Sequence, residues 1–585
     1  MLIICTSILI TIYFLCSYIK FLYLCLLTKI HTMKKITISL LSLMLMANFA
    51  FAGGLVTNTN QSAAWARMLV RDASTSIDAV YYNPAGLVKL QDGFYLSLSN
   101  QSIFQTRTLT NTFPYLNHDE FTGTTNAPIF PSFYAAYKTG KWAFSFAFNP
   151  IGGGGSAEFA KGIPMVEMPV ANLAHSFASM GVTGYSTDIY MKGQSIYYGL
   201  QLGASYAIND NISLFAGVRF VDANNSYVGH IKDNQFRLQD GSYVPVPDFM
   251  NNVGQQAQAG SEQAATGASL ATGGGDALGN WTSQGAGGYT FDQAVAGGVM
   301  TPEQQAQFEG GLLQFGYTQE QIDAMTLDQA QQTYYATATS LTTMSENLHN
   351  QSLQLFAGAK LMGDQELDVT QKGYGFTPII GANISLMDDN LNIGIKYEFK
   401  TNLTLTNTTA KGKGFVIGLN PDGTPIEMFP DGAETNADMP AMLSVGAKIN
   451  LSKVVTLHGG FHTYWDRKTG WADVDTKIDN NFQEYALGAE FHITDRFLLS
   501  AGMLYAATGV NPSYQGDLTY SLTTNTGAVG GAYKLGDRFT LQFGGYLVHY
   551  QSQTIQGNYD GTTYMQTYEK DLWAFSLGLD FNIAK

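Results

Sequence analysis

Short segments in which every second residue is apolar recur along this chain of 585 residues. Residues 391–399 (LNIGIKYEF) place leucine, isoleucine, tyrosine and phenylalanine on one face of a strand, and asparagine, glycine, lysine and glutamate on the other. Residues 142–149, 212–220, 443–451 and 573–583 repeat this alternation. A soluble sheet would need a covering layer over its apolar face, and candidate helices are scarce. A closed membrane barrel needs no such layer, because lipid covers the apolar face and small or polar residues line the interior.

The connectors between these segments fall into two kinds. Six are short and polar, as at 139–141, 209–211 and 388–390, and seven longer ones alternate with them. This arrangement predicts an all-β fold, a 14-stranded antiparallel transmembrane barrel with short turns at one end. We expect the third strand at 142–149, and a barrel that occupies residues 94–585.

Composition excludes several classes of function. Charged residues make up 13% of the chain and the net charge is −15, against about 25% charged residues in typical soluble domains. With no basic run, nucleic-acid binding is not expected. We find no motif for catalysis and no cofactor site, and predict that the protein is not an enzyme. His458 and His462 share one strand face but lie ~13 Å apart along it, too far for one metal ion.

The N-terminal residues resemble a secretion signal. Residues 33–52 combine two lysines, an apolar run and Ala-Phe-Ala, which predicts a signal peptide cleaved after residue 52. We interpret residues 1–32 as an extension ahead of the true start. Their alternative reading is an inner-membrane anchor, since they are apolar and long enough to span a bilayer. All three cysteines precede residue 33.

Residues 53–93 show no strand alternation. Ala64, Trp65, Met68 and Leu69 fit one face of a short helix. A barrel of this width leaves a hole unless something fills it, so we expect this segment to be a plug, or hatch, inside the lumen. Its charged residues are candidate partners of charges on the barrel wall: Arg67, Arg71, Asp72 and Asp78.

A long connector, residues 226–372, separates the fifth and sixth predicted strands. Residues 252–298 within it are rich in Gly, Ala, Gln and Ser and are interpreted as low complexity. Segments that begin at Thr301, Thr318 and Thr326 each have an acid within three residues, which predicts short capped helices. The loop is either a ligand collector or a surface decoration.

Residues 53–108, including "SIDAVYYNPAGL", resemble the outer-membrane transporters of long-chain fatty acids, a family that also includes importers of aromatic hydrocarbons. The resemblance implies a 14-stranded barrel closed by an N-terminal hatch. It assigns Asn83, Pro84 and Ala85 to the hatch motif, which would hold the hatch against the wall beside a sideways exit. The alternative is an ordinary Asn-Pro turn. The resemblance also implies that Gly53, Gly54 and Leu55 reach into a ligand pocket, and that the third strand is kinked.

The expected function is therefore passive uptake of long-chain fatty acids or similar hydrophobic molecules by a monomer in the outer membrane. Its partners are the cargo, membrane lipid and the barrel-insertion machinery. Two alternatives remain: a general pore for small solutes, and a structural barrel that binds an external partner through residues 226–372.

Overall fold

The computed structural model describes residues 55–471 and 475–584. The signal peptide at 33–52, the extension at 1–32, Gly53 and Gly54 lie outside the described residues. The chain divides into two compact units. One comprises the residues up to Asp233 and from Asp364 onward, and the other runs from Asn234 to Gly363.

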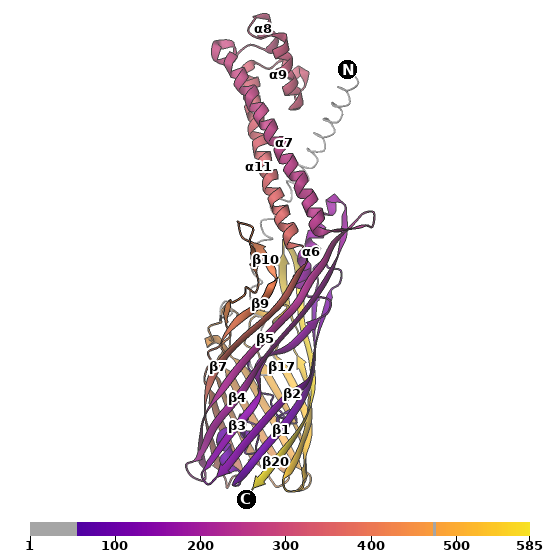
Figure 1. The fold of residues 1–585 in the computed structure, drawn as a ribbon. Coiled ribbons are helices and arrows are strands. Elements are labelled where there is room, and N and C mark those ends of the chain that lie inside the picture. The colour runs from indigo at the N-terminus through magenta and orange to yellow at the C-terminus, as the bar shows by residue number, and fades with distance from the viewer. Residues whose placement is uncertain (1–54, 472–474, 585) are drawn as a thin grey trace. The chain divides into compact units, whose positions relative to one another are not determined.

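The first unit is a closed antiparallel barrel of 14 strands, which confirms the fold predicted from the turns. It closes where β1 (Gly93–Asn111) pairs with β20 (Thr562–Ala584), visible side by side in Figure 1. The other wall strands are β2 (Glu120–Thr139), β3 (Trp142–Phe159), β4 (Val182–Ala207), β5 (Ile212–Leu238), β7 (Gln365–Leu386), β8 (Leu391–Glu398), β13 (Met442–Asn450), β14 (Val455–Tyr464), β15 (Phe482–His492), β16 (Phe497–Ala507), β17 (Thr524–Leu535) and β18 (Phe539–Tyr550).

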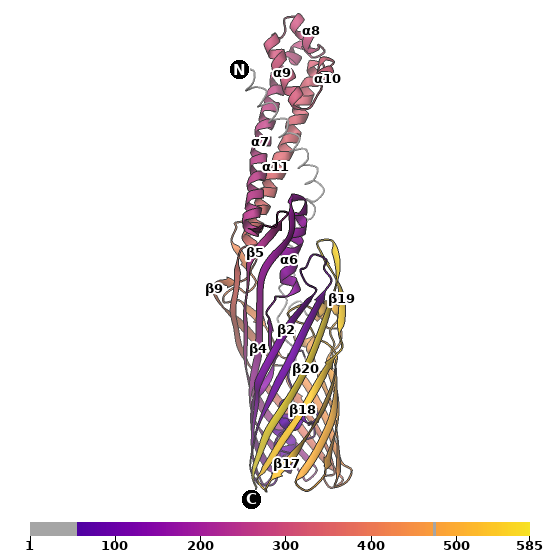
Figure 2. The ribbon, with the colours of Figure 1, turned by 90° about the vertical axis from the view of Figure 1, so that its right-hand side faces the viewer.

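Smaller elements extend this wall or cover one end of it. Helix α6 (Pro164–Ser176) and strand β19 (Gln553–Tyr559) are seen in Figure 2. The others are β9 (Thr404–Gly414), β10 (Val416–Leu419), β11 (Pro425–Glu427), β12 (Glu434–Asn436) and the 3-10 turns η3 (Ala178–Met180), η5 (Asp466–Lys468), η6 (Asp475–Lys477) and η7 (Pro512–Tyr514).

The outward face of the wall carries an apolar band. On β20, the exposed residues Trp573, Phe575, Leu577 and Leu579 follow one another at every second position, and exposed Asp571 ends the series. Aromatic side chains gather near the short turns, where Trp142 packs on Tyr206 and Phe539 on Phe581. This surface is typical of a membrane-spanning barrel with an interfacial aromatic girdle.

Several strands are longer than predicted. The third strand was predicted at 142–149, but β3 continues to Phe159. Strands β5 and β7 also extend beyond the prediction, so their connection begins after Leu238 rather than at 226 and ends at Gln365 rather than at 372. The outward positions of β5 are apolar as far as Phe220 and then become Asp222 and Asn224. Sequence alternation therefore ends where the apolar band ends, although backbone pairing continues.

The second unit is a helical hairpin. Helices α7 (Val246–Trp281) and α11 (Leu327–Leu361) pair closely; Gly254 faces Phe356 at one end and Gly274 faces Tyr334 at the other, so they are antiparallel. The unit also contains β6 (Tyr243–Pro245), the π turn η4 (Thr282–Ala286), α8 (Phe291–Ala296), α9 (Pro302–Gln314) and α10 (Gln319–Asp323). None of the helices in the described residues is long and apolar enough to cross a membrane.

Most of residues 252–298, the segment interpreted as low complexity from its composition, belongs to α7. The buried residues of α7 are mainly small and recur at intervals of three and four, as Gly254, Ala257, Ser261 and Ala264 do. Such a seam permits close helix packing with little hydrophobicity. The predicted caps at Thr301, Thr318 and Thr326 are confirmed, each completed by a glutamine three residues later, although the third helix is long.

Candidate functional site

The N-terminal segment, residues 55–92, lies against the inward faces of the barrel strands and is buried over most of its length. It contains α4 (Ala63–Ala66), α5 (Ala79–Tyr82) and the 3-10 helix η2 (Pro84–Lys89). Ser62 caps α4 by accepting a hydrogen bond from the backbone N–H of Trp65. The Trp65 ring packs edge-on against Tyr546 of β18, with ring centroids 5.6 Å apart.

A belt of inward glycines makes room for this segment. A Cβ at any of the seven positions would come within 3.0 Å of residues 67–72. This belt was not predicted from the sequence, although a glycine at an inward position in each of several consecutive strands is a recognisable pattern. The seven are Gly394, Gly446, Gly460, Gly488, Gly502, Gly530 and Gly544, one on each of β8 and β13–β18.

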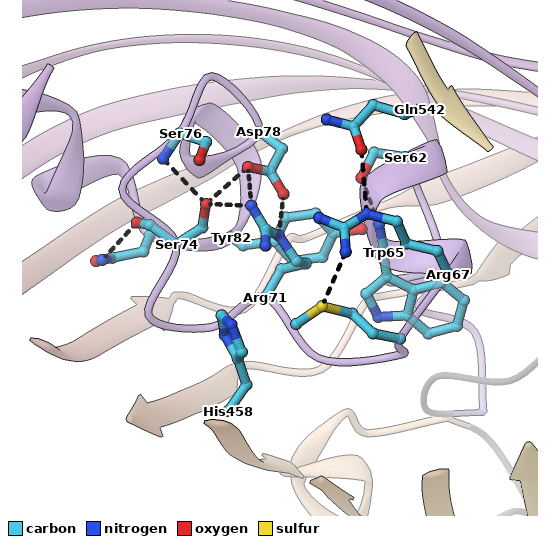
Figure 3. Close-up of polar contacts among 12 residues, drawn as sticks. Ser62, Trp65, Arg67, Arg71, Ser74, Ser76, Asp78, Tyr82, His458 and Gln542 are labelled. Carbon is cyan, nitrogen blue, oxygen red and sulfur yellow. Dashed lines mark hydrogen bonds and ion pairs between the residues drawn. The ribbon is translucent and has the colours of Figure 1, made fainter. Parts of the chain in front are cut away.

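The charges of the segment meet charges of the wall. Arg67 pairs with Glu490 of β15 at 2.5 Å, and Arg71 lies 3.4 Å from the same carboxylate. Arg71 also pairs with Asp78 of its own segment at 2.5 Å. Figure 3 shows Arg71 held by Asp78 and Ser74, and Arg67 reaching Gln542 of β18. The structure thus brings the two candidate arginines to one wall carboxylate, while Asp78 serves the segment itself.

Asp72 meets the wall through a histidine. His462 Nε2 lies 2.6 Å from Asp72 Oδ1, and its Nδ1 lies 2.7 Å from Glu484. Ser444 donates a further hydrogen bond to Asp72. His458, the other histidine of β14, instead contacts Glu490. The two histidines therefore serve separate carboxylate contacts.

The Asn-Pro-Ala turn is fastened to consecutive strands. Asn83 donates a hydrogen bond to Asn383 of β7 at 2.8 Å. The backbone carbonyls of Pro84 and Ala85 accept hydrogen bonds from Ser205 of β4 and Ser213 of β5, at 2.6 and 2.7 Å. The turn thus lies against the wall formed by β4, β5 and β7.

Beside the turn, Lys396 of β8 donates to the carbonyl of Tyr81 at 2.9 Å. Lys396 also forms an ion pair with Glu398, and Glu398 forms a second ion pair with Arg219 of β5. These three wall charges form one buried network under α5.

Strands β2 and β3 separate over part of their length. Their ladder pairs Phe133 with Phe148 and resumes only at Thr124 and Glu158. Residues 125–132 contain two prolines, and 149–157 contain one proline and four consecutive glycines. Proline cannot donate to a ladder, and glycine permits the bend, so the local sequence accounts for the interruption.

The start of the N-terminal segment fills part of this irregular stretch. Asn58 N–H donates to Ile151 O at 2.8 Å, and Gly153 N–H donates to Val56 O at 2.9 Å. Gly153 has φ of +87°, and a Cβ there would come within 2.5 Å of the Ser195 carbonyl. Only glycine fits this conformation comfortably. Backbone hydrogen bonds thus join the N-terminal segment to the part of β3 that does not pair with β2.

A small apolar pocket of about 20 Å³ lies between α6, β4, β5, β7 and the loops of the barrel unit. Met165, Met191, Tyr227, Phe415 and Phe429 are among its lining residues. Leu55 is not among the described residues that line it. Leu55 is buried in the barrel core instead, where its backbone hydrogen-bonds to the carboxyl of Asp466.

Two buried carboxyls lie in loops, Asp466 in contact with Leu55 and Asp517 next to the apolar pocket. Burial raises the pKa of Asp466 to about 7, against a hydrogen bond from Phe482 N–H that lowers it. Burial likewise raises the pKa of Asp517 to about 7, against a hydrogen bond from Met165 N–H. Asp517 therefore connects its loop to the first turn of α6, and its neighbour Leu518 lines the apolar pocket with Met165.

No family model and no curated protein sequence matches the chain. Among solved structures, it is similar to a Pseudomonas aeruginosa FadL homologue at 12% identity, covering 90% of this chain and 99% of that one, with a TM-score of 0.51. It is also similar to the P. putida toluene transporter TodX (14% identity, 87% and 95% covered, TM-score 0.45) and the Ralstonia pickettii toluene transporter TbuX (13%, 86% and 93%, 0.39). The first likeness shows a shared barrel fold.

Proposed function

We propose that this protein is an outer-membrane channel for passive uptake of hydrophobic molecules, namely long-chain fatty acids or aromatic hydrocarbons. The observation that carries the proposal is the direct pairing of residues 56–58 with the interrupted strand β3. Because the N-terminal segment pairs with the wall at the interruption, a small movement of the segment changes both the lumen and the wall together.

The apolar pocket suits capture of such cargo. Each buried methylene is worth ~0.8 kcal/mol, so once the walls of the pocket move apart, its apolar lining favours an acyl chain or an aromatic ring over water. Release through the wall between β2 and β3, directly into lipid, avoids a return to water. The toluene transporters named above and the FadL homologue share the general fold, which agrees with a cargo of this kind.

The N-terminal segment acts as the hatch in this proposal. Asn83, Pro84 and Ala85 fasten it to β4, β5 and β7, while Arg67, Arg71 and Asp72 fasten it to β13–β15 and β18. Residues 56–58 belong to neither of these two sets of contacts and pair with the interrupted strand β3 instead. In this proposal they are the part of the segment that moves. The protein reaches the outer membrane after cleavage of the signal peptide at 33–52 and works there as a monomer without catalysis.

The experiment is uptake of labelled oleate and labelled toluene by cells that lack their own importers. They carry either the wild-type chain or a variant in which Asn83-Pro84-Ala85 is replaced by Gly-Ser-Gly. We expect uptake with the wild type and its loss in the variant. Heat-modifiable electrophoretic mobility confirms that both barrels are folded.

A folded wild-type barrel that takes up neither compound would contradict the proposal. Equal uptake by wild type and variant would remove the hatch role from the motif while leaving the cargo class intact. A Ser452→Ala variant, in an exposed short turn far along the chain from the motif, is the matched control.

A further inference from the structure

Helix α6 lies at the end of the barrel opposite the short turns and is buried on almost every side (Figure 2). Nine of its thirteen residues are buried, and these include the polar Glu167 and Asn172. A helix that lies on a protein surface buries one apolar stripe and exposes its polar face. Helix α6 is therefore enclosed by neighbouring segments of the barrel unit rather than laid over them.

Hydrogen bonds hold the two ends of α6 to two separate loops. At its start, Met165 N–H donates to Asp517, in the connection between β16 and β17, at 2.6 Å. Near its end, Asn172 Nδ2 donates to Asp560, in the turn between β19 and β20, at 3.0 Å. Each contact joins one donor to one carboxyl group, and water can replace either partner when they separate.

Side-chain contacts also surround the middle and the C-terminal end of α6. Glu167 accepts a hydrogen bond from the Tyr185 hydroxyl at 2.6 Å. The His175 ring stacks on Tyr115, which lies in the connection between β1 and β2, with ring centroids 3.8 Å apart. The neighbouring strands β3, β4, β5 and β7 are instead joined by long backbone ladders. Helix α6 can therefore leave its place without breaking a ladder.

Glycines with positive φ flank this helix. Gly162, two residues before α6, has a φ of +76°, and Gly181, which ends the turn η3 after α6, has a φ of +90°. Hinges are a few residues that absorb changes in φ and ψ, and glycine absorbs them at the least steric cost. Pro169 lies inside α6, where it removes one backbone hydrogen bond of the helix. The segment is thus built to bend at both ends.

The apolar pocket lies between α6 and the wall. Met165 and Val166 of α6 line it together with wall residues such as Met191 of β4 and Tyr227 of β5. Its volume of about 20 Å³ holds roughly one water molecule, so neither an acyl chain nor an aromatic ring fits while α6 stays in place. Because the wall strands are held by their ladders, movement of α6 is the least costly way to enlarge the pocket.

We propose that α6 is a lid over the apolar pocket, and that cargo enters when the segment from Gly162 to Gly181 moves away from the loops that hold it. The inference rests on the proposed function and deepens it, because it identifies the element that admits hydrophobic molecules to the pocket. Only residues 160–163 separate this lid from the interrupted strand β3. The entry to the pocket and the interruption in the wall thus belong to one continuous stretch of chain.

The test locks α6 in place through the contact between Asn172 and Asp560. No cysteine follows residue 25, so Asn172→Cys together with Asp560→Cys creates the only cysteine pair in the barrel. Cells that lack their own importers carry this variant, and a short reducible bis-methanethiosulfonate linker joins the two thiols. We expect the linker to abolish uptake of labelled oleate and toluene, and reduction to restore it, because a fixed lid keeps the pocket at its resting volume.

The matched control is Thr554→Cys with Thr567→Cys, which the same linker joins across β19 and β20 without involving α6. These two threonines are register partners, and their hydroxyl oxygens lie 2.9 Å apart. Uptake should be unchanged in this control. Mass spectrometry of the purified proteins confirms the linkage, and heat-modifiable mobility confirms folding.

Hydrogen exchange of residues 163–176 in the purified proteins gives a readout that does not depend on cargo. The linker should slow exchange of this segment in the variant that locks α6 and leave it unchanged in the control pair. Full uptake by the locked variant, an equal loss in the control pair, or exchange that does not respond to the linker would each overturn the lid and leave the proposed function intact. Wild-type cells that take up neither compound would overturn the proposed function, and the entry role of α6 with it.

Discussion

At the scale of single residues, Asp517 makes the loop over the apolar pocket sensitive to pH. Its Oδ2 accepts the Met165 N–H at 2.6 Å and its Oδ1 accepts Gln566 at 3.2 Å. Burial raises its pKa from 3.8 to about 7, so the folded loop retains a proton that an opened loop releases. The opened loop thus becomes more stable relative to the folded loop as the pH rises from about 4 to about 7. Above that pH, the free energy of opening no longer changes.

We therefore expect opening of this contact to become easier by ~1.4 kcal/mol per pH unit inside that window. Hydrogen exchange of peptides covering residues 163–176, corrected for intrinsic rates, should show greater protection at pH 5 than at pH 8. Asp517→Asn should remove this difference. Peptides around Phe482, which contacts the similarly buried Asp466, should keep their own pH dependence and act as the internal control. If hydrogen-exchange protection near residue 165 does not change with pH in the wild type, the proposed role of Asp517 is contradicted.

At the scale of elements, the interruption of β3 contains two glycines with positive φ, Gly153 and Gly155. Gly153→Ala places a Cβ against the Ser195 carbonyl at a φ of +87°, which costs roughly 1–3 kcal/mol. We expect lower resistance to thermal unfolding, by heat-modifiable mobility, and slower oleate uptake. Gly184→Ala in β4 is the matched control, because no atom lies within 4 Å of its new Cβ. A Gly153→Ala barrel as stable and active as this control would show that uptake does not need the interruption.

The same elements show what the sequence predicts and what it cannot. The strands between short turns are predictable because lipid demands an apolar residue at every second position, as at Leu391, Ile393 and Ile395. Beyond the band this demand ends, so the outer part of β5 is missed. The glycine run of β3 reads as a loop because its pairing partner, residues 56–58, is remote in sequence. Likewise, the wall partners of Arg67 and Asp72 are separated from them by hundreds of residues, and no local pattern connects them.

At the scale of the whole molecule, the helical hairpin and the barrel are separate compact units, which makes them separable experimentally. Strands β5 and β7 remain paired up to Ile231 and Gln365, so a tight turn can replace residues 234–363. We expect the shortened barrel to fold and to take up oleate at a rate within about twofold of the wild type, since its core and its pocket are its own. Loss of uptake from a folded shortened barrel would favour the alternative in which this region binds an external partner.

The glycine belt around residues 67–72 has an electrical consequence. Seven backbone positions face the segment without a side chain that could swing aside, so on these seven strands we expect little room for ions between the segment and the wall. A planar bilayer containing the resting protein should behave as an insulator, unlike one containing an open porin of similar strand number. Current should flow only in discrete events, each marking a displacement of the whole segment. Under the proposed function, hydrophobic cargo then passes without a standing leak of small hydrophilic solutes.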